Sequence, residues 1–89
     1  MEIVALLISY PLTMMFPLTF AERLLLVFCV FVVLIVELIN SAVESTVDLV
    51  STEYSELAKN AKDYGSAAVM LTVLGALSVW IYTIYKSLN

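Results

Sequence analysis

The chain has 89 residues, a net charge of −4 and a hydrophobic fraction of 63%, whereas about 45–50% apolar residues is usual for a soluble domain. A chain of this length cannot bury that much apolar surface in its own core. We therefore expect lipid, or further copies of the chain, to cover it. Histidine is absent, Cys29 is the single cysteine, and there is no basic stripe. These features exclude an internal disulfide, a Cys/His zinc site and a histidine base, and they argue against nucleic-acid binding.

The first apolar segment, residues 3–21, carries no charge but contains Pro11 and Pro17. Proline interrupts a helix because it lacks the N–H donor and clashes with the preceding turn. We expect Pro17 to end a first span over residues 3–16, which would be only about 21 Å long at about 1.5 Å per residue. Local thinning of the bilayer, or packing against a neighbour, would have to compensate for this short length.

The second span is predicted over residues 20–50. Thr19 and Glu22 have the spacing of a capping box, which predicts a helix start at Thr19. The uncharged run Leu24–Val36 leads directly into Glu37, and a span of about 20 residues counted from Leu24 would include it. An ionisable group inside a span costs a few kcal/mol and therefore indicates a functional site.

A polar turn over residues 51–56 follows, with Ser51 and Ser55 as candidate caps. The third span is predicted over residues 56–86, uncharged from 64 to 85. Its far end carries aromatic residues and a lysine in the manner of an interfacial belt: Trp80, Tyr82, Tyr85 and Lys86. Lys59 and Lys62 place the region 51–63 and the N-terminus in the cytosol by the positive-inside rule.

Polar residues are in helical phase on both sides of the turn. The second span carries Glu37, Asn40, Ser41, Glu44 and Asp48, and the third carries Lys59, Lys62, Asp63 and Ser66. If the turn is centred near residue 53 or 54, residues whose numbers add to about 107 are level. This predicts that Glu44 meets Asp63, that Asp48 meets Lys59, and that Ser41 meets Ser66.

Two opposed polar faces at a membrane surface can hold Mg²⁺ and a polyphosphate, because Mg²⁺ is typically bound by one or two carboxylates plus phosphate oxygens. There is no P-loop motif. Glu37 lies deepest, which suits a general base acting on a lipid hydroxyl. Glu44 lies about 10 Å nearer to water, by the rise of a helix over seven residues, and suits the metal.

Residues 37–48, ELINSAVESTVD, and 61–69, AKDYGSAAV, carry a specific pattern. The pattern E-x-x-N-S-A-x-E-x-x-x-D followed by A-K-D-x-G-S-A-A-V resembles the small integral-membrane diacylglycerol kinases of bacteria. The resemblance implies one membrane kinase domain over residues 1–89, an all-α bundle of three transmembrane helices that forms a homotrimer in the inner membrane. It implies an active site at the cytosolic face, where the γ-phosphoryl of ATP passes to diacylglycerol with Mg²⁺.

The resemblance also implies residue roles. Glu37 would be the catalytic base and Glu44 the metal ligand, supported by Asn40 and Asp48. The nucleotide would be bound by Glu44, Glu53, Tyr54, Ser55, Lys62 and Asp63. The lipid substrate would lie against Glu2, Arg23, Glu37, Ser66, Trp80 and Tyr85.

One departure from the family pattern concerns the beginning of the chain. Relatives carry a cytosolic amphipathic helix with a second metal-binding carboxylate, and this chain begins at about the end of that segment. Glu2 matches its last acidic position, and we expect activity to be impaired by the truncation.

Three alternative functions remain at this point. The related undecaprenol kinases share most of the motif. A non-enzymatic ion or proton pathway subunit would use Glu37 as a carrier but would not need Asn40, Lys62 and Asp63. The chain could also be an inactive truncated homologue.

Overall fold

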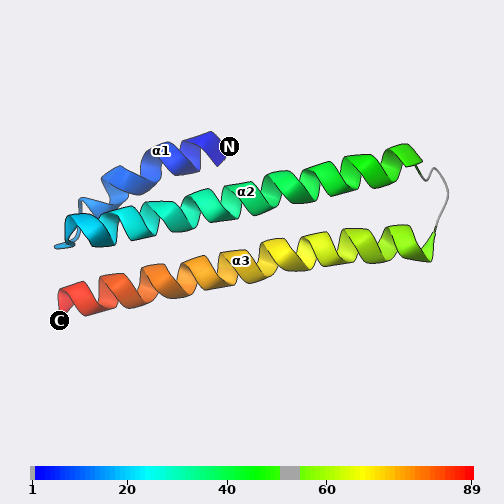
Figure 1. The fold of residues 1–89 in the computed structure, drawn as a ribbon. Coiled ribbons are helices and arrows are strands. Elements are labelled where there is room, and N and C mark those ends of the chain that lie inside the picture. Colours follow the sequence, from blue (N-terminus) through cyan, green and yellow to red (C-terminus); the bar gives the residue numbers. More distant parts are fainter. Residues whose placement is uncertain (1, 51–54) are drawn as a thin grey trace.

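The computed structural model describes residues 2–50 and 55–89, and these residues form helices without any strand. The helices are α1 (Glu2–Thr13), α2 (Phe20–Val50) and α3 (Glu56–Leu88). α2 and α3 form a long antiparallel hairpin, and α1 folds back beside the first half of α2 (Figure 1). The predicted all-α class is confirmed, and the second helix has the predicted bounds.

α1 ends at Thr13, three residues earlier than the predicted limit. Pro11 lies inside the helix, and its missing N–H removes a bond from the last turn. Beyond Thr13 the chain turns through bonds of shorter span, in which the Met14, Met15 and Phe16 amides each donate to a carbonyl three residues earlier. The connection between α1 and α2 is therefore longer than the interval from residue 16, the predicted end of the first span, to the predicted start at Thr19.

The predicted capping box at the start of α2 is confirmed. The Thr19 amide donates to Glu22 Oε1 at 2.8 Å, and the Glu22 amide donates to Thr19 Oγ1 at 3.1 Å. Ser55 caps α3 by accepting from the Ala58 amide at 3.4 Å. The other candidate cap, Ser51, lies outside the described residues.

Two contacts define the register of α2 against α3. Trp80 Nε1 donates to the Leu26 carbonyl at 3.0 Å, and Gly65 faces the Asn40 side chain. The numbers of these pairs add to 106 and 105, close to the predicted 107. The indole of Trp80 thus points between the helices and not toward a membrane interface, whereas Tyr82 and Tyr85 are exposed.

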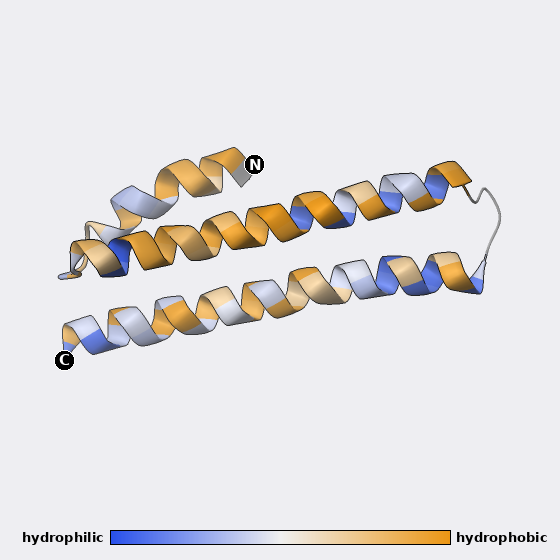
Figure 2. Ribbon diagram, in the orientation of Figure 1, coloured by the Kyte–Doolittle hydropathy of each residue, from blue (hydrophilic) through white to orange (hydrophobic). Residues whose placement is uncertain are grey.

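The hairpin is apolar along most of its length (Figure 2), and it has almost no interior. Among the described residues, Leu18 and Leu26 are the buried hydrophobic side chains. α2 and α3 are long and apolar enough to cross a membrane, and α1 is a shorter apolar helix. At about 1.5 Å per residue, α2 is about 46 Å long, so it extends beyond the hydrocarbon core of a bilayer, which is about 30 Å thick.

Candidate functional site at the polar end of the hairpin

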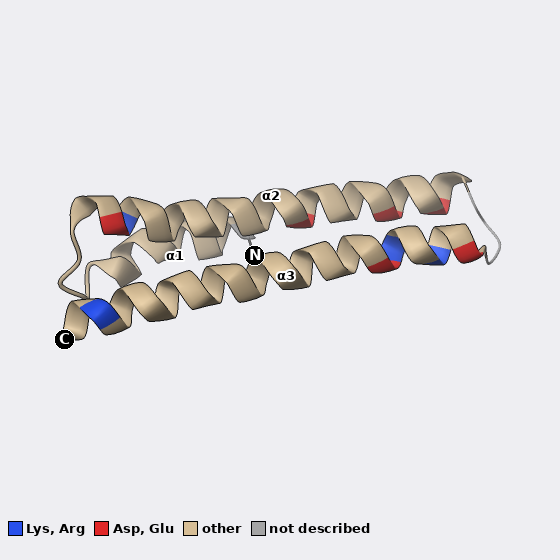
Figure 3. Ribbon diagram, turned by 60° about the horizontal axis from the view of Figure 1, so that its bottom comes forward, with Lys and Arg blue, Asp and Glu red and all other residues tan. Residues whose placement is uncertain are grey.

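The charged residues of α2 and α3 lie mostly in the half of the hairpin nearest the connection between the two helices, with a few more at the opposite end (Figure 3). There, Lys62 Nζ lies 2.6 Å from Asp48 Oδ1, and Lys59 Nζ lies 2.9 Å from Asp63 Oδ2. The predicted meeting of Asp48 with Lys59 is therefore wrong. Lys59 is four residues before Asp63 on the same helix face, whereas Lys62 reaches across to α2.

Both ion pairs are largely exposed to water, so they add little to stability. They leave two ammonium groups and two carboxylates together on one water-facing surface. The hydrogen bond to Asp48, with the negative charges of Asp48 and Glu44, raises the pKa of Lys62, which lies outside the uncharged stretch 64–85. Lys62 therefore keeps its positive charge across the physiological range, as a lysine that binds phosphate must.

Asn40 links this surface to the interior of the hairpin. Its Nδ2 donates to Glu44 Oε1 at 3.4 Å, one turn further along α2. Its Oδ1 is buried and has no hydrogen-bond partner among the described residues. The reason is the close approach of Gly65, where a Cβ would overlap Oδ1 and would lie 3.2 Å from Asn40 Cγ.

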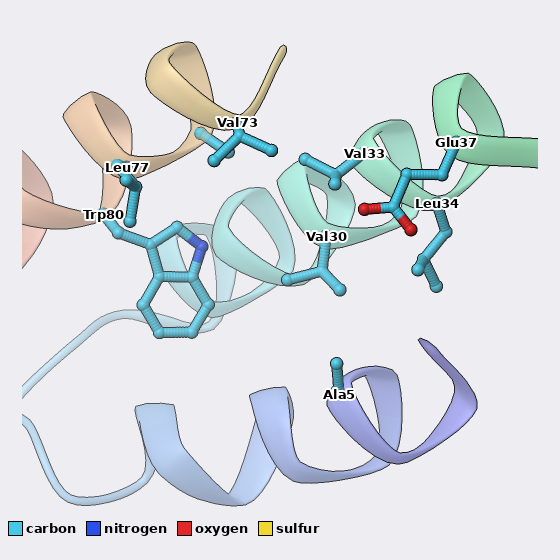
Figure 4. A pocket seen from close by; sticks show the side chains of 9 residues that line it. Ala5, Val30, Val33, Leu34, Glu37, Val73, Leu77 and Trp80 are labelled. Atoms are coloured by element: carbon cyan, nitrogen blue, oxygen red, sulfur yellow. The ribbon is translucent and has the colours of Figure 1, made fainter. Parts of the chain in front are cut away.

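Glu37 lies at a different place, on the wall of an otherwise apolar pocket (Figure 4). The pocket has a volume of about 460 Å³, within the usual range for ligand pockets, about 300–1,000 Å³. Side chains of all three helices line it: Ala5, Val30, Val33, Leu34, Glu37, Val73, Ala76, Leu77 and Trp80. Glu37 is its one charged lining residue, and the carboxylate points into the space between the helices (Figure 4).

The observed register gives the depth of Glu37. The uncharged stretch 64–85 of α3 lies level with about residues 21–42 of α2. Glu37 is then about five residues, or roughly 7 Å, inside the apolar zone, while Glu44 and Asp48 lie beyond it. The structure therefore separates a carboxylate in an apolar pocket, level with the uncharged stretch of α3, from an exposed charged surface.

The remaining predicted site residues are scattered. Ser66 is exposed near Gly65, and Ser55 is used as a helix cap. Arg23 is about 21 Å from Glu37 along α2, where its Nη2 donates to the Phe16 carbonyl at 3.3 Å. Tyr85 is exposed, five residues beyond Trp80. Glu53 and Tyr54 lie outside the described residues, and so does the side chain of Glu2.

Sequence reasoning missed the part played by Gly65 and most of the pocket lining. Apart from Glu37 and Trp80, the pocket residues are alanine, valine and leucine, which look the same as lipid-facing residues in a sequence. Gly65 did carry a signal, because glycine is unfavourable inside a helix and this one lies between the charged and uncharged parts of α3. Its partner Asn40 is visible only in the structure.

The oxygen donors present fit a magnesium ion that arrives with a polyphosphate. Glu44 and Asp48 lie one turn apart, and both are exposed. Within residues 2–50 and 55–89, no three acidic, cysteine or histidine side chains converge to form a closed metal cage. Mg²⁺ needs no such cage, since it typically keeps several waters and takes one or two carboxylates plus phosphate oxygens.

The long apolar hairpin, with a carboxylate in its apolar zone and a charged surface at one end, defines an α-helical membrane protein. Residues 1–84 match the family described as prokaryotic diacylglycerol kinase. The chain belongs to that family.

Several curated relatives are named diacylglycerol kinase. The protein of Escherichia coli K12 is 44% identical over 64 residues, which cover 72% of this chain and 52% of that protein. The protein of Pseudomonas aeruginosa is 50% identical over 66 residues, covering 72% and 54%, and that of Haemophilus influenzae is 42% identical over 73 residues, covering 82% and 62%. The chain thus spans about half the length of the first two relatives.

The charged surface can be tested by titration. Replacing Asp48 with alanine removes the acceptor that raises the pKa of Lys62, so the Lys62 pKa should fall. The measurement is ¹⁵N NMR of the lysine ammonium groups against pH in detergent micelles. Glu56→Ala, which removes an exposed carboxylate that does not contact Lys62, should leave the value unchanged. An unaltered Lys62 pKa in Asp48→Ala would show that the ion pair does not form in solution.

Proposed function

We propose that this chain is a lipid kinase that transfers the γ-phosphoryl group of ATP to the hydroxyl of diacylglycerol, yielding phosphatidic acid. One observation carries the proposal: Glu37 lies in an apolar pocket level with the uncharged stretch of α3, and an exposed charged surface follows along the same hairpin. A kinase acting on a lipid needs both environments next to each other. The names of the relatives agree with this function.

The pocket would take an acyl chain of the lipid, with the hydroxyl toward Glu37. Glu37 would act as a general base that accepts the hydroxyl proton. The lipid oxygen then attacks the γ-phosphorus, the bond from that phosphorus to the β–γ bridging oxygen breaks, and ADP leaves. The apolar lining excludes water from the attacking oxygen, which limits hydrolysis of ATP.

The nucleotide would lie along the charged surface. Lys62 supplies a point charge for phosphate oxygens, and Asp63 and Asp48 hold the two lysines in place. Glu53, Tyr54 and Ser55 are proposed nucleotide contacts on the strength of the motif alone. Bound Mg²⁺ would neutralise charge on the transferring phosphoryl group, and Glu44, held by Asn40, is the proposed ligand, with Asp48 as a second oxygen donor.

The proposed setting is the bacterial inner membrane, with three membrane spans and the charged surface in the cytosol. α1 is about 18 Å long at about 1.5 Å per residue, so it would cross only with local thinning of the bilayer or the support of α2. The exposed polar face of α2 and the lack of a core agree with a homotrimer, in which neighbouring copies cover what one chain leaves open.

The roles of the two glutamates are tested by kinetics in mixed micelles, with radiolabelled ATP and either diacylglycerol or undecaprenol. Glu37→Gln should lower the transfer rate by about 10²–10⁴-fold while nucleotide binding persists, since a base contributes to rate. Glu44→Gln should instead raise the Mg²⁺ concentration needed for half-maximal rate. Glu56→Gln, at an exposed position on α3, serves as the control.

Two outcomes would count against this function, and a third would count against the separate roles of the two glutamates. If the wild-type chain shows no ATP turnover in the presence of either lipid, the non-enzymatic alternative is favoured. Faster turnover with undecaprenol than with diacylglycerol would move the chain to the related specificity. Equal losses of nucleotide binding in both glutamate variants would show that the argument from depth is wrong.

The pocket is tested by filling it. Ala76 lines the pocket, so Ala76→Phe should raise the KM for diacylglycerol several-fold and leave the KM for ATP unchanged. Leu74→Phe adds an aromatic ring at an exposed position of the same helix that does not line the pocket, and it should change neither value. A rise in both KM values for Ala76→Phe would mean that the substitution disturbs the whole hairpin.

The homotrimer is tested by native mass spectrometry and by chemical crosslinking in mild detergent. Both should show three copies, because the apolar and polar faces of α2 and α3 are largely uncovered in a single chain. Monomers alone, at detergent concentrations where kinase activity is retained, would rule out a trimer as the active form.

A further inference from the structure

At Gly65, the backbone of α3 lies close to a side chain of α2, and no such contact among the described residues is found at Gly75. A Cβ at this position would overlap Asn40 Oδ1 and press on Asn40 Cγ, whereas a Cβ at Gly75 would meet nothing within 4 Å. α3 uses alanine at several small positions, including Ala67 and Ala68, two and three residues after Gly65. Alanine is the better helix former, so the glycine at 65 is explained by the space that Asn40 occupies.

The carboxamide of Asn40 is held at both ends. Its Nδ2 faces Glu44, and a carboxylate accepts only from a donor, which sets the orientation of the amide. Its Oδ1 then points at Gly65, where no N–H or O–H group of residues 2–50 and 55–89 donates to it. Because the Oδ1 lies where a Cβ would be, a Gly65 Cα–H points toward it, and this weak contact is of a kind found between closely packed helices.

We propose that Gly65 is a positioning residue for Glu44. Its lack of a side chain lets α3 hold the Asn40 carboxamide in the one orientation that directs Nδ2 to the Glu44 carboxylate. A methyl group at 65 would rotate the carboxamide away, since Oδ1 is the flexible end of a side chain and yields before the backbone does. Glu44 would then lose its hydrogen bond while the ion pairs and the apolar pocket remain. This inference rests on the proposed role of Glu44 toward Mg²⁺.

The test is a double-mutant cycle. Gly65→Ala should raise the Mg²⁺ concentration for half-maximal kinase rate by about tenfold, a typical effect of removing a group that orients a metal ligand. The KM for diacylglycerol should stay unchanged, which separates positioning from general damage. Gly75→Ala makes the same change in the same helix without the contact and should behave as wild type.

The second arm of the cycle is Asn40→Ala. This variant removes the hydrogen bond and also the side chain that the methyl would strike. The pair Asn40→Ala with Gly65→Ala should therefore be no worse than Asn40→Ala alone. Losses that multiply, or a Gly65→Ala variant that matches Gly75→Ala, would overturn the proposal.

Two further readouts keep the test decisive. If Gly65→Ala alone fails to fold, the double variant must restore folding, and its failure to do so would refute the steric account. The side-chain amide NMR signal of Asn40 in micelles should shift in Gly65→Ala and not in Gly75→Ala, whether or not the chain has kinase activity. An unshifted signal contradicts the inference about Gly65, whereas absent wild-type activity with a shifted signal contradicts only the kinase assignment.

Discussion

The close antiparallel contact between α2 and α3 is the interaction on which the rest of this structure depends. In the uncharged part of the hairpin, Trp80 Nε1 donates a hydrogen bond to the Leu26 carbonyl. At the boundary with the charged part, Gly65 leaves room for the Asn40 side chain. These two contacts determine the register. The register in turn sets which carboxylate lies among apolar side chains and which lies in water.

The second constraint is that the described residues form almost no buried core. A single chain buries so few side chains that hydrophobic packing within it cannot account for its stability. A bilayer changes this balance in two ways. Every backbone hydrogen bond must be made within the helices there, and exposing apolar side chains to lipid carries no free-energy cost. Close helix contact and polar bonds then hold α2 against α3, and the contacts of Asn40 and Trp80 are examples.

The charges at the polar end lie together because α3 returns beside α2, and they are paired with one another across and along the helices. Such exposed pairs separate at little cost, so the same groups are available to a polyphosphate. The surroundings of Glu37 are different. It lies on an apolar wall, where its chemistry is that of a single carboxylate toward whatever polar atom enters the pocket.

Much of this was predictable from the sequence, since helical phase, capping residues and uncharged stretches act locally. The all-α class, the bounds of α2, the capping box at Thr19 and the level of α2 against α3 follow from such signals. The early end of α1 did not follow from them. Whether a helix continues past a turn that proline has weakened depends on its tertiary surroundings. The partner of Asp48 was wrongly predicted as Lys59, because the long side chain of Lys62 reaches about a full turn from its own level.

By itself, the sequence determined that two long apolar helices form an antiparallel pair and that five polar residues share one face of α2. Periodicity and the length of an apolar run are properties of the chain alone. Only the tertiary structure decided that Glu37 and Trp80 line one pocket, and that Asn40 points its oxygen at Gly65 and its nitrogen at Glu44. Those relations depend on the distance and rotation between two helices. That geometry is set by side-chain contacts between residues far apart in the chain, which no local pattern encodes.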